Sequence, residues 1–217
     1  MNERDPLDAL ALSLRSGAVE LFLVRHGDAI PADDGAHLAY EDYEAHPLSE
    51  RGRLQARAAA EHLAAFGLGA VYTSPIARAR ETAEAIAERS GLASIAEHDL
   101  REVEIGAQNG AMSLQQRLVA LAAHAIREGT WDGIPGTEAS ARVRARMLGV
   151  LDGVAARHPG TRVAVVSHAG AINAALGAIA GATHDFLFPL ANASISVVRI
   201  NAGTRLLMSA NETAHLR

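Results

Sequence analysis

The residues best suited to chemistry begin where an apolar run ends. Leu21 to Val24 are followed at once by Arg25, His26 and Gly27, and a short apolar run is typical of a buried strand. A guanidinium at the mouth of such a strand is costly without an anionic partner, and Asp28 is the only acid close by in sequence. The rigid fork of an arginine suits carboxylate or phosphate oxygens. We therefore expect Arg25 and His26 to border an anion site.

A second candidate segment joins a strand to a helix. In TSPIARARETAEAIA, residues 73–87, the predicted helix carries Arg78 and Arg80 in its first turn. Basic side chains oppose the helix dipole there, so they are unfavourable unless an anion compensates them. Residues two positions apart on a helix point about 200° away from each other. At most one arginine can face the site, and a solvated surface position suits Arg80 better than Arg78.

Two further candidates follow other predicted elements. His168 comes directly after the apolar run RVAVVS and just before a helix, so its position resembles that of His26. Glu102 lies in LREVEIG, a segment without clear periodicity, and a surface carboxylate is the ordinary explanation for such a residue. Glu104 is a rival acid two positions along the chain.

The elements that must position these residues alternate along the chain. Strands are predicted at residues 20–24, 70–73, 94–97 and 162–167, with a final pair at 193–200 and 205–209. Helices are predicted from the cap Ser49 to Phe66, at 77–90, at 113–128, from the cap Thr137 to Arg157, and at 169–179. Alternation of this kind predicts an α/β fold with a mostly parallel sheet covered on both faces. Ligands of such folds bind beyond the carboxyl ends of the strands, where VRHG and VSHAG lie.

Composition excludes several classes of protein and site. The 217 residues suit a single domain, which we place at 18–217 after an N-terminal extension at 1–17. The net charge of −5 argues against a nucleic-acid partner. No window is apolar enough for a membrane span, and the N-terminus lacks the basic segment of a signal peptide, so we expect a cytoplasmic protein. The chain has no cysteine and no lysine, which removes thiolate nucleophiles, Schiff bases and phosphate-loop lysines.

Five segments, taken together, resemble the histidine phosphatase superfamily, which is phosphoglycerate-mutase-like (branch 1). They are LVRHG at 23–27, PLSERGRLQA at 47–56, YTSPIARARETAEAIA at 72–87, LREVEIGAQNG at 100–110 and VAVVSHAGAINAAL at 163–176. RHG alone is a weak signal, whereas five matches in family order over residues 19–200 are specific. The resemblance implies a three-layer α/β/α sandwich and a phosphomonoester hydrolase that acts on a small phosphorylated metabolite.

The resemblance also implies residue roles. His26 matches the nucleophile that becomes a phosphohistidine, and Arg25, Arg78 and His168 match the residues that clamp the phosphoryl oxygens. Glu102 matches the acid that protonates the leaving oxygen. This segment continues as AQNG where many relatives have a W-x-G pattern, so Glu104 stays open as the acid. Asp28 follows RHG, and Asn192 in LANASISV matches a recurring asparagine, so both are possible substrate-binding residues.

Other readings of the chain remain open at this point. A mutase-type phosphotransferase would share the phosphohistidine but would need cations for a second anionic acceptor, and the acidic loop at 31–47 supplies none. An inactive phospho-ligand-binding relative is a third alternative. A serine hydrolase lacks its G-x-S-x-G elbow, and the 10 histidines show no metal-binding spacing, so we expect neither a metal nor another cofactor.

Substrate preference should lie in the 28–47 loop and in residues 107–137, which include Trp131. The helix at 169–179 or the C-terminal strands could support a homodimer, although core packing explains both.

Overall fold

A computed structural model describes residues 12–29, 44–105 and 114–217 of the chain. The predicted acidic loop therefore lies largely outside the described residues, as do most of the predicted N-terminal extension and residues 107–113. At the described end of that extension, Leu12 and Ser13 are buried, and Ser13 caps a short 3₁₀ helix, η2, at Leu14–Ser16. None of the helices within the described ranges is long and apolar enough to cross a membrane.

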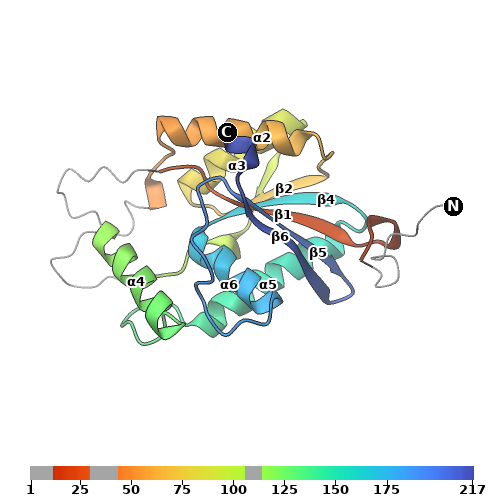
Figure 1. Ribbon diagram of the computed structural model, residues 1–217. Helices are drawn as coiled ribbons and strands as arrows, with labels where there is room; N and C mark the ends of the chain where they lie inside the picture. Colours follow the sequence, from red (N-terminus) through yellow and green to blue (C-terminus); the bar gives the residue numbers. More distant parts are fainter. Residues whose placement is uncertain (1–11, 30–43, 106–113) are drawn as a thin grey trace.

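A six-stranded mixed sheet forms the centre of the fold, in the order β3-β2-β4-β1-β5-β6 (Figure 1). Its strands are β1 Val19–Arg25, β2 Ala70–Thr73, β3 Ser94–Ala96, β4 Arg162–Ser167, β5 Ile195–Asn201 and β6 Thr204–Glu212. Strand β1 pairs in parallel with β4, β4 pairs in parallel with β2, and β2 pairs in parallel with β3. Strand β5 runs antiparallel to both β1 and β6. The predicted parallel sheet is thus confirmed, with an antiparallel pair added at one edge.

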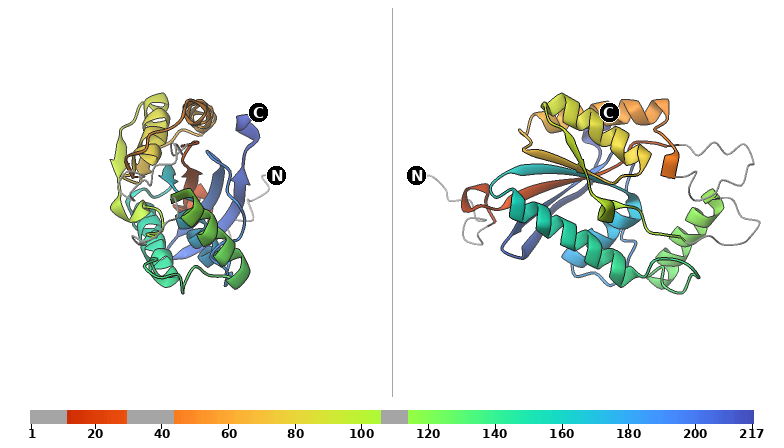
Figure 2. Two further views of the ribbon diagram at one scale, coloured as in Figure 1. Left: turned by 90° about the vertical axis from the view of Figure 1, so that its left-hand side faces the viewer. Right: turned by 180° about the vertical axis from the view of Figure 1, so that it is seen from behind.

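Each face of the sheet is covered by helices because the strand side chains alternate between two apolar cores. Along β1, Leu21 and Leu23 belong to one core, whereas Phe22 and Val24 belong to the other. The Phe22 face is covered by α2 (Glu50–Ala64) and α3 (Ala77–Ser90); the Leu21 face is covered by α5 (Ser140–Arg157) and α6 (Ala169–Ile179). Figure 2 shows the sheet between these two helical layers, which makes the predicted α/β/α sandwich.

Helix α4, Leu114–Glu128, stands apart from both layers (Figure 1). It lies beyond the end of the sheet at which β1 ends, and it is the element whose inner side closes the site described below. Short 3₁₀ helices complete the described elements: η3 at His98–Leu100 leads toward Glu102, and η4 at Ala214–Leu216 ends the chain beside α2.

The predicted start of helix α5, which ends at Arg157, is wrong. Thr137 does not cap it, because Oγ1 of Thr137 has no hydrogen-bond partner among the described residues and its backbone pairs with Ile105 in an isolated bridge. The helix begins at Ser140, whose N–H donates to the carboxylate of Asp132 at 2.8 Å. A side chain eight residues back in sequence therefore takes the place of the local cap that a Thr at a turn suggests.

Candidate active site

Two histidines meet where two neighbouring parallel strands end. Arg25 of β1 pairs in register with Ser167 of β4, so the next residue along each strand, His26 and His168, lies at the same edge of the sheet. Their ring centroids are 5.1 Å apart, with the planes inclined at 60°. Both side chains are buried. The structure therefore brings together two residues that are separated by most of the chain.

The hydrogen bonds of His26 define which ring nitrogen can react. Nδ1 lies 2.7 Å from the carbonyl oxygen of Gly27, which can only accept, so Nδ1 carries the proton. Nε2 accepts a hydrogen bond from Nε of Arg78 at 3.1 Å, so it holds a lone pair. Burial, and then the charges of Arg78 and Arg25, hold the pKa of His26 well below its ordinary value. The ring is therefore a neutral imidazole with an unprotonated Nε2.

Arg78 reaches this point from the start of α3. It is fully buried, and the helix has no side-chain cap at Ile76. Arg80, two positions on, is 55% exposed and forms an ion pair with Glu84. The two arginines diverge as the helical geometry predicts, and the buried guanidinium is the one that lies beside His26.

His168 is held by a residue that sequence reasoning did not select. Its Nε2 lies 2.9 Å from Oγ of Ser74, the first residue after β2. Nδ1 of His168 is buried and has no hydrogen-bond partner among the described residues. Burial and the nearby charge of Arg78 lower the pKa of His168 well below the ordinary value. The one local signal for Ser74 is that it directly follows a strand, as His26 and His168 do; its contact with His168 depends on β2 lying next to β4.

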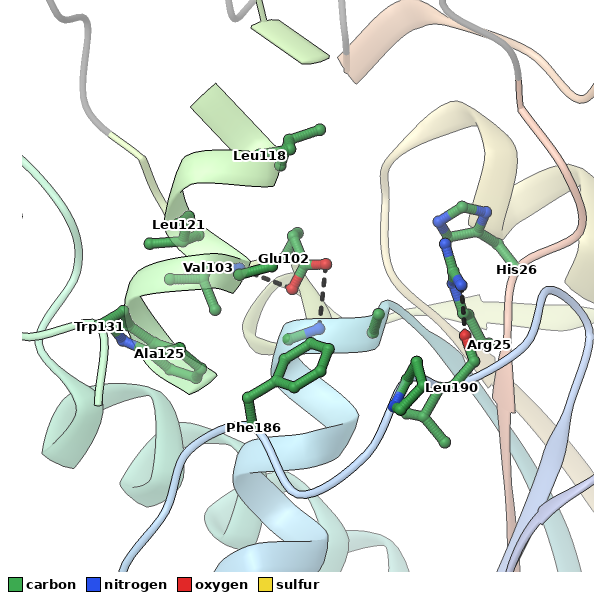
Figure 3. Close-up of a pocket in the computed structure, with 14 residues that line it drawn as sticks. Arg25, His26, Glu102, Val103, Leu118, Leu121, Ala125, Trp131, Phe186 and Leu190 are labelled. Carbon is green, nitrogen blue, oxygen red and sulfur yellow. Dashed lines mark hydrogen bonds between the residues drawn. The ribbon is translucent and has the colours of Figure 1, made fainter. Parts of the chain in front are cut away.

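Glu102 projects into the site, whereas Glu104 does not. The carboxylate of Glu102 accepts hydrogen bonds from the N–H groups of Val103 and Gly170, at 3.0 and 3.2 Å (Figure 3), and from that of Ala171 at 2.9 Å. Two of these donors belong to the first turn of α6, which fixes the position of the carboxyl group. Glu104 is 44% exposed and pairs with Arg101 at 3.0 Å. Geometry thus favours Glu102 as the acid of the site.

Gly170 is required by the close approach of this carboxylate. A Cβ atom at Gly170 would lie 2.7 Å from Oε1 of Glu102 and 2.9 Å from a methyl group of Val103. A similar restriction holds behind His26, where a Cβ atom at Gly27 would lie 2.5 Å from the carbonyl oxygen of Gly52. The N–H of Gly27 also donates to Oγ1 of Thr82 in α3 at 3.1 Å. These contacts fix the backbone on either side of the reactive groups.

The remaining predicted residues have different surroundings. Arg25 lines the same cavity as His26 and donates to the backbone carbonyl of Leu190. Asn192 donates to the carbonyl oxygen of His26 at 3.3 Å, so it supports the backbone of the histidine. Asp28 accepts from Oγ of Ser49 at 2.7 Å. Neither Asp28 nor Asn192 lines the cavity that holds His26, and substrate binding by them stays a prediction.

A cavity of about 250 Å³ opens beside these groups (Figure 3). Arg25 and His26 lie on one side of it, and Glu102 projects into it between them and helix α4 (Figure 3). Most of the remaining lining side chains are apolar; they include Leu118, Leu121, Ala125, Trp131, Phe186 and Leu190. No three His, Cys, Asp or Glu side chains among the described residues are grouped in a way that could hold a metal ion. The arrangement can bind an anion at its cationic end and offer it a neutral imidazole and a carboxylate.

Comparison with known proteins identifies the family of this chain. A family model for the histidine phosphatase superfamily (branch 1) matches residues 21–213. The chain belongs to this superfamily.

Three relatives show how closely this histidine phosphatase resembles known members. It is 31% identical over 202 residues to phosphoserine phosphatase 1 of Hydrogenobacter thermophilus, a match that covers 91% of this chain and 94% of that protein. It is 31% identical over 189 residues to the probable phosphoglycerate mutase GpmB of Cronobacter sakazakii, covering 83% and 84% of the two chains. A mycobacterial glucosyl-3-phosphoglycerate phosphatase structure superposes with a TM-score of 0.74 at 27% identity, covering 90% of this chain and all of that one. The predicted family, fold and phosphatase class are confirmed.

Proposed function

We propose that this histidine phosphatase hydrolyses the phosphomonoester of a small metabolite through a phosphohistidine at Nε2 of His26. One observation carries the proposal: Nδ1 of His26 bonds to a carbonyl and Nε2 keeps its lone pair, within reach of a cavity that also holds Glu102. A neutral imidazole is the form that can attack phosphorus. The carbonyl of Gly27 then stabilises the positive charge that the ring gains when the bond to phosphorus forms.

The proposed reaction has two steps. In the first, Nε2 bonds to phosphorus as the bond from phosphorus to the leaving oxygen breaks, and protonated Glu102 gives its proton to that oxygen. In the second, Glu102 takes a proton from water, the water oxygen bonds to phosphorus, and the bond from nitrogen to phosphorus breaks. Inorganic phosphate leaves, and both residues return to their starting protonation states.

Arg25, Arg78 and His168 would bind the phosphoryl oxygens in both steps. Arg78 donates to the Nε2 lone pair in the described structure, so this lone pair must be released before it can attack. A phosphoryl oxygen is a stronger acceptor for a guanidinium, because the hydrogen bond is then charge-assisted at both ends. Substrate binding would thus turn Arg78 from a partner of His26 into a partner of the phosphoryl group, where it stabilises the transition state.

A mutase-type phosphotransferase is the second candidate, since one relative is named as a probable mutase. A mutase must bind the phosphorylated acceptor as well as the transferred group, which calls for further cations. Among the described residues that line the cavity, Arg25 is the only cationic side chain. This composition favours water as the acceptor. Release of inorganic phosphate without interconversion of phosphoglycerate isomers would support the hydrolase.

The intermediate provides the direct test. The protein is mixed with p-nitrophenyl phosphate radiolabelled on phosphorus and quenched rapidly. We expect a protein-bound label that survives base and is lost in acid, that is absent from His26→Ala, and that persists when the exposed His98 is replaced by alanine. Turnover by His26→Ala at the wild-type rate would contradict the mechanism. Absence of both label and turnover in the wild-type protein would instead favour a phospho-ligand-binding relative.

We further propose a cytoplasmic location and a homodimer, to be tested by cell fractionation and by analytical ultracentrifugation. The C-terminal strands are the better candidate for a dimer contact, because β6 is an outer strand of the sheet and Met208 on it is exposed. Helix α6 is buried over residues 171–177 within the monomer, so its small residues are explained by the core.

A further inference from the structure

The cavity of this site has few charged groups. Its charged residues are Arg25 and Glu102, which the proposed mechanism uses together with His26, and the other described lining residues carry no charge (Figure 3). The phosphoryl group of a substrate would lie against Arg25 and His26, with the leaving oxygen near Glu102. The group esterified to that oxygen would then meet the remaining lining residues, which form a mainly apolar wall.

Helix α4 supplies much of this wall. Leu118, Leu121, Ala122 and Ala125 all line the cavity, and their spacing of three, four and seven residues places them on one helical face. The residue next to Leu118, Val119, is 63% exposed, so it lies on another face of the same helix. One side of α4 is thus an apolar surface aimed at the substrate position.

Two polar groups of the wall are already engaged within the protein. The indole N–H of Trp131 donates to the carbonyl of Glu138 at 3.0 Å. The carbonyl of Leu190 accepts from Arg25. These groups are therefore committed before any ligand binds, and Phe186 adds an aromatic ring beside them (Figure 3).

We propose that the alcohol portion of the substrate is an uncharged hydrocarbon or aromatic group that packs against this wall. The inference rests on the proposed phosphatase function and narrows its substrate class. A carboxylate or second phosphate placed here would lose its hydration, and the described lining residues offer it no cation besides Arg25, which the phosphoryl group would already occupy. An apolar group is instead stabilised in proportion to the area that it removes from water. The cavity of about 250 Å³ exceeds the ~150 Å³ that holds a benzene molecule, so a substituted ring or a medium-length chain would fit.

This substrate class differs from those in the names of the relatives. Phosphoserine and glucosyl-3-phosphoglycerate both carry a carboxylate close to the phosphate ester. A member of the same superfamily can share the phosphatase chemistry and still bind a different alcohol, because Leu118 and Trp131 of the wall are not among the residues that we propose to act on the phosphoryl group.

A matched pair of esters tests the inference. Hexyl phosphate and 5-carboxypentyl phosphate have the same chain length and similar leaving alcohols, and they differ in a terminal carboxylate. We expect kcat/KM for hexyl phosphate to exceed that for the carboxylated ester by about tenfold or more. Leu118→Lys places a cation on the wall and should reduce this ratio by about tenfold. Val119→Lys adds the same charge on the exposed face and should leave the ratio within about twofold of the wild-type value.

The outcomes separate this inference from the function on which it rests. His26-dependent hydrolysis that is equal for the two esters, or faster for the carboxylated one, overturns the apolar substrate class and leaves the phosphatase intact. An equal effect of Leu118→Lys and Val119→Lys on the ratio also overturns it, because the wall would then have no special contact with the substrate. No His26-dependent hydrolysis of either ester, or of p-nitrophenyl phosphate, overturns the proposed function itself.

A binding measurement avoids any dependence on the folding of variants. Titration calorimetry of the wild-type protein with hexylphosphonate and 5-carboxypentylphosphonate should show tighter binding of the former, again by about tenfold. Equal or weaker binding of hexylphosphonate contradicts the inference.

Discussion

Nε of Arg78 lies 3.1 Å from Nε2 of His26, on the lone pair that the proposed mechanism uses for attack. The same guanidinium is among the causes that hold the pKa of His26 below its ordinary value. Arg78 thus has two separable effects: it keeps the imidazole neutral before substrate binds, and it is then available to a phosphoryl oxygen. Both effects follow from its complete burial at the start of α3.

Replacing Arg78 with methionine removes the charge and keeps most of the volume. We expect kcat/KM for p-nitrophenyl phosphate to fall by about a hundredfold or more, because a cation that stabilises the transition state is lost. Arg80→Met is the matched control, since Arg80 lies on the exposed side of the same turn, and it should change kcat/KM by less than about twofold. Comparable losses in the two variants would contradict the assignment.

The buried histidines predict how stability depends on pH. The pKa values of His26 and His168 lie well below 6.5 in the folded protein, so the unfolded chain binds more protons as pH falls through 6.5. The free energy of unfolding should be level above this pH and should decrease below it, by up to about 1.4 kcal/mol per pH unit for each histidine. Urea unfolding at a series of pH values measures the slope. His26→Asn should reduce the slope, whereas His98→Asn, at an exposed position, should not.

Glu102 should matter most when the leaving alcohol is a poor leaving group. Glu102→Gln retains the hydrogen-bonding shape but cannot donate a proton, so kcat for an alkyl phosphate should fall by about a hundredfold or more. The loss should be much smaller with p-nitrophenyl phosphate, whose leaving oxygen needs little protonation. Glu104→Gln should change neither rate, because Glu104 is exposed and paired with Arg101. If Glu104→Gln shows the larger loss, the acid is Glu104.

Gly170→Ala tests the position of the same carboxylate. The added methyl group would lie 2.7 Å from Oε1 of Glu102, and the flexible side chain can yield, so activity should fall by about tenfold while the protein stays folded. Gly149→Ala is the matched control: it lies inside α5, where an added methyl group meets nothing within 4 Å. That substitution should preserve activity and raise stability by roughly 0.5–1 kcal/mol. Thermal unfolding and steady-state kinetics of both variants provide the measurement.

The elements that position the phosphoryl-binding residues could be predicted closely from sequence. The apolar runs and glycine stops placed the strands at 70–73 and 162–167 and the helices at 77–90 and 169–179 where the structure has them. Glu102 was harder, because its segment has no period and its three backbone donors come partly from α6, far along the chain. The pairing of Ser74 with His168 depends on β2 lying next to β4, which is a property of strand order and not of local sequence.

The wall of the cavity could be predicted only as a segment, residues 107–137, and not residue by residue. Leu118 and Leu121 read as the core-facing side of an ordinary amphipathic helix, and only the position of α4 beyond the sheet turns that side toward a ligand. Trp131 was expected within the segment that determines substrate preference, and the structure places it in the wall. The prediction of a cap at Thr137 is wrong because the first N–H of α5, that of Ser140, donates to the carboxylate of Asp132 and not to a neighbouring side chain.

Because α4 lies outside both helical layers, the residues of the site come from two kinds of segment. Strand ends in the middle of the sheet hold the two histidines of the site, and their geometry is tied to the folding of the whole domain. The surface that we propose to meet the alcohol belongs largely to one peripheral helix and to loop residues. We therefore expect substitutions in that helix to change which alcohol binds while the pair of histidines stays in place.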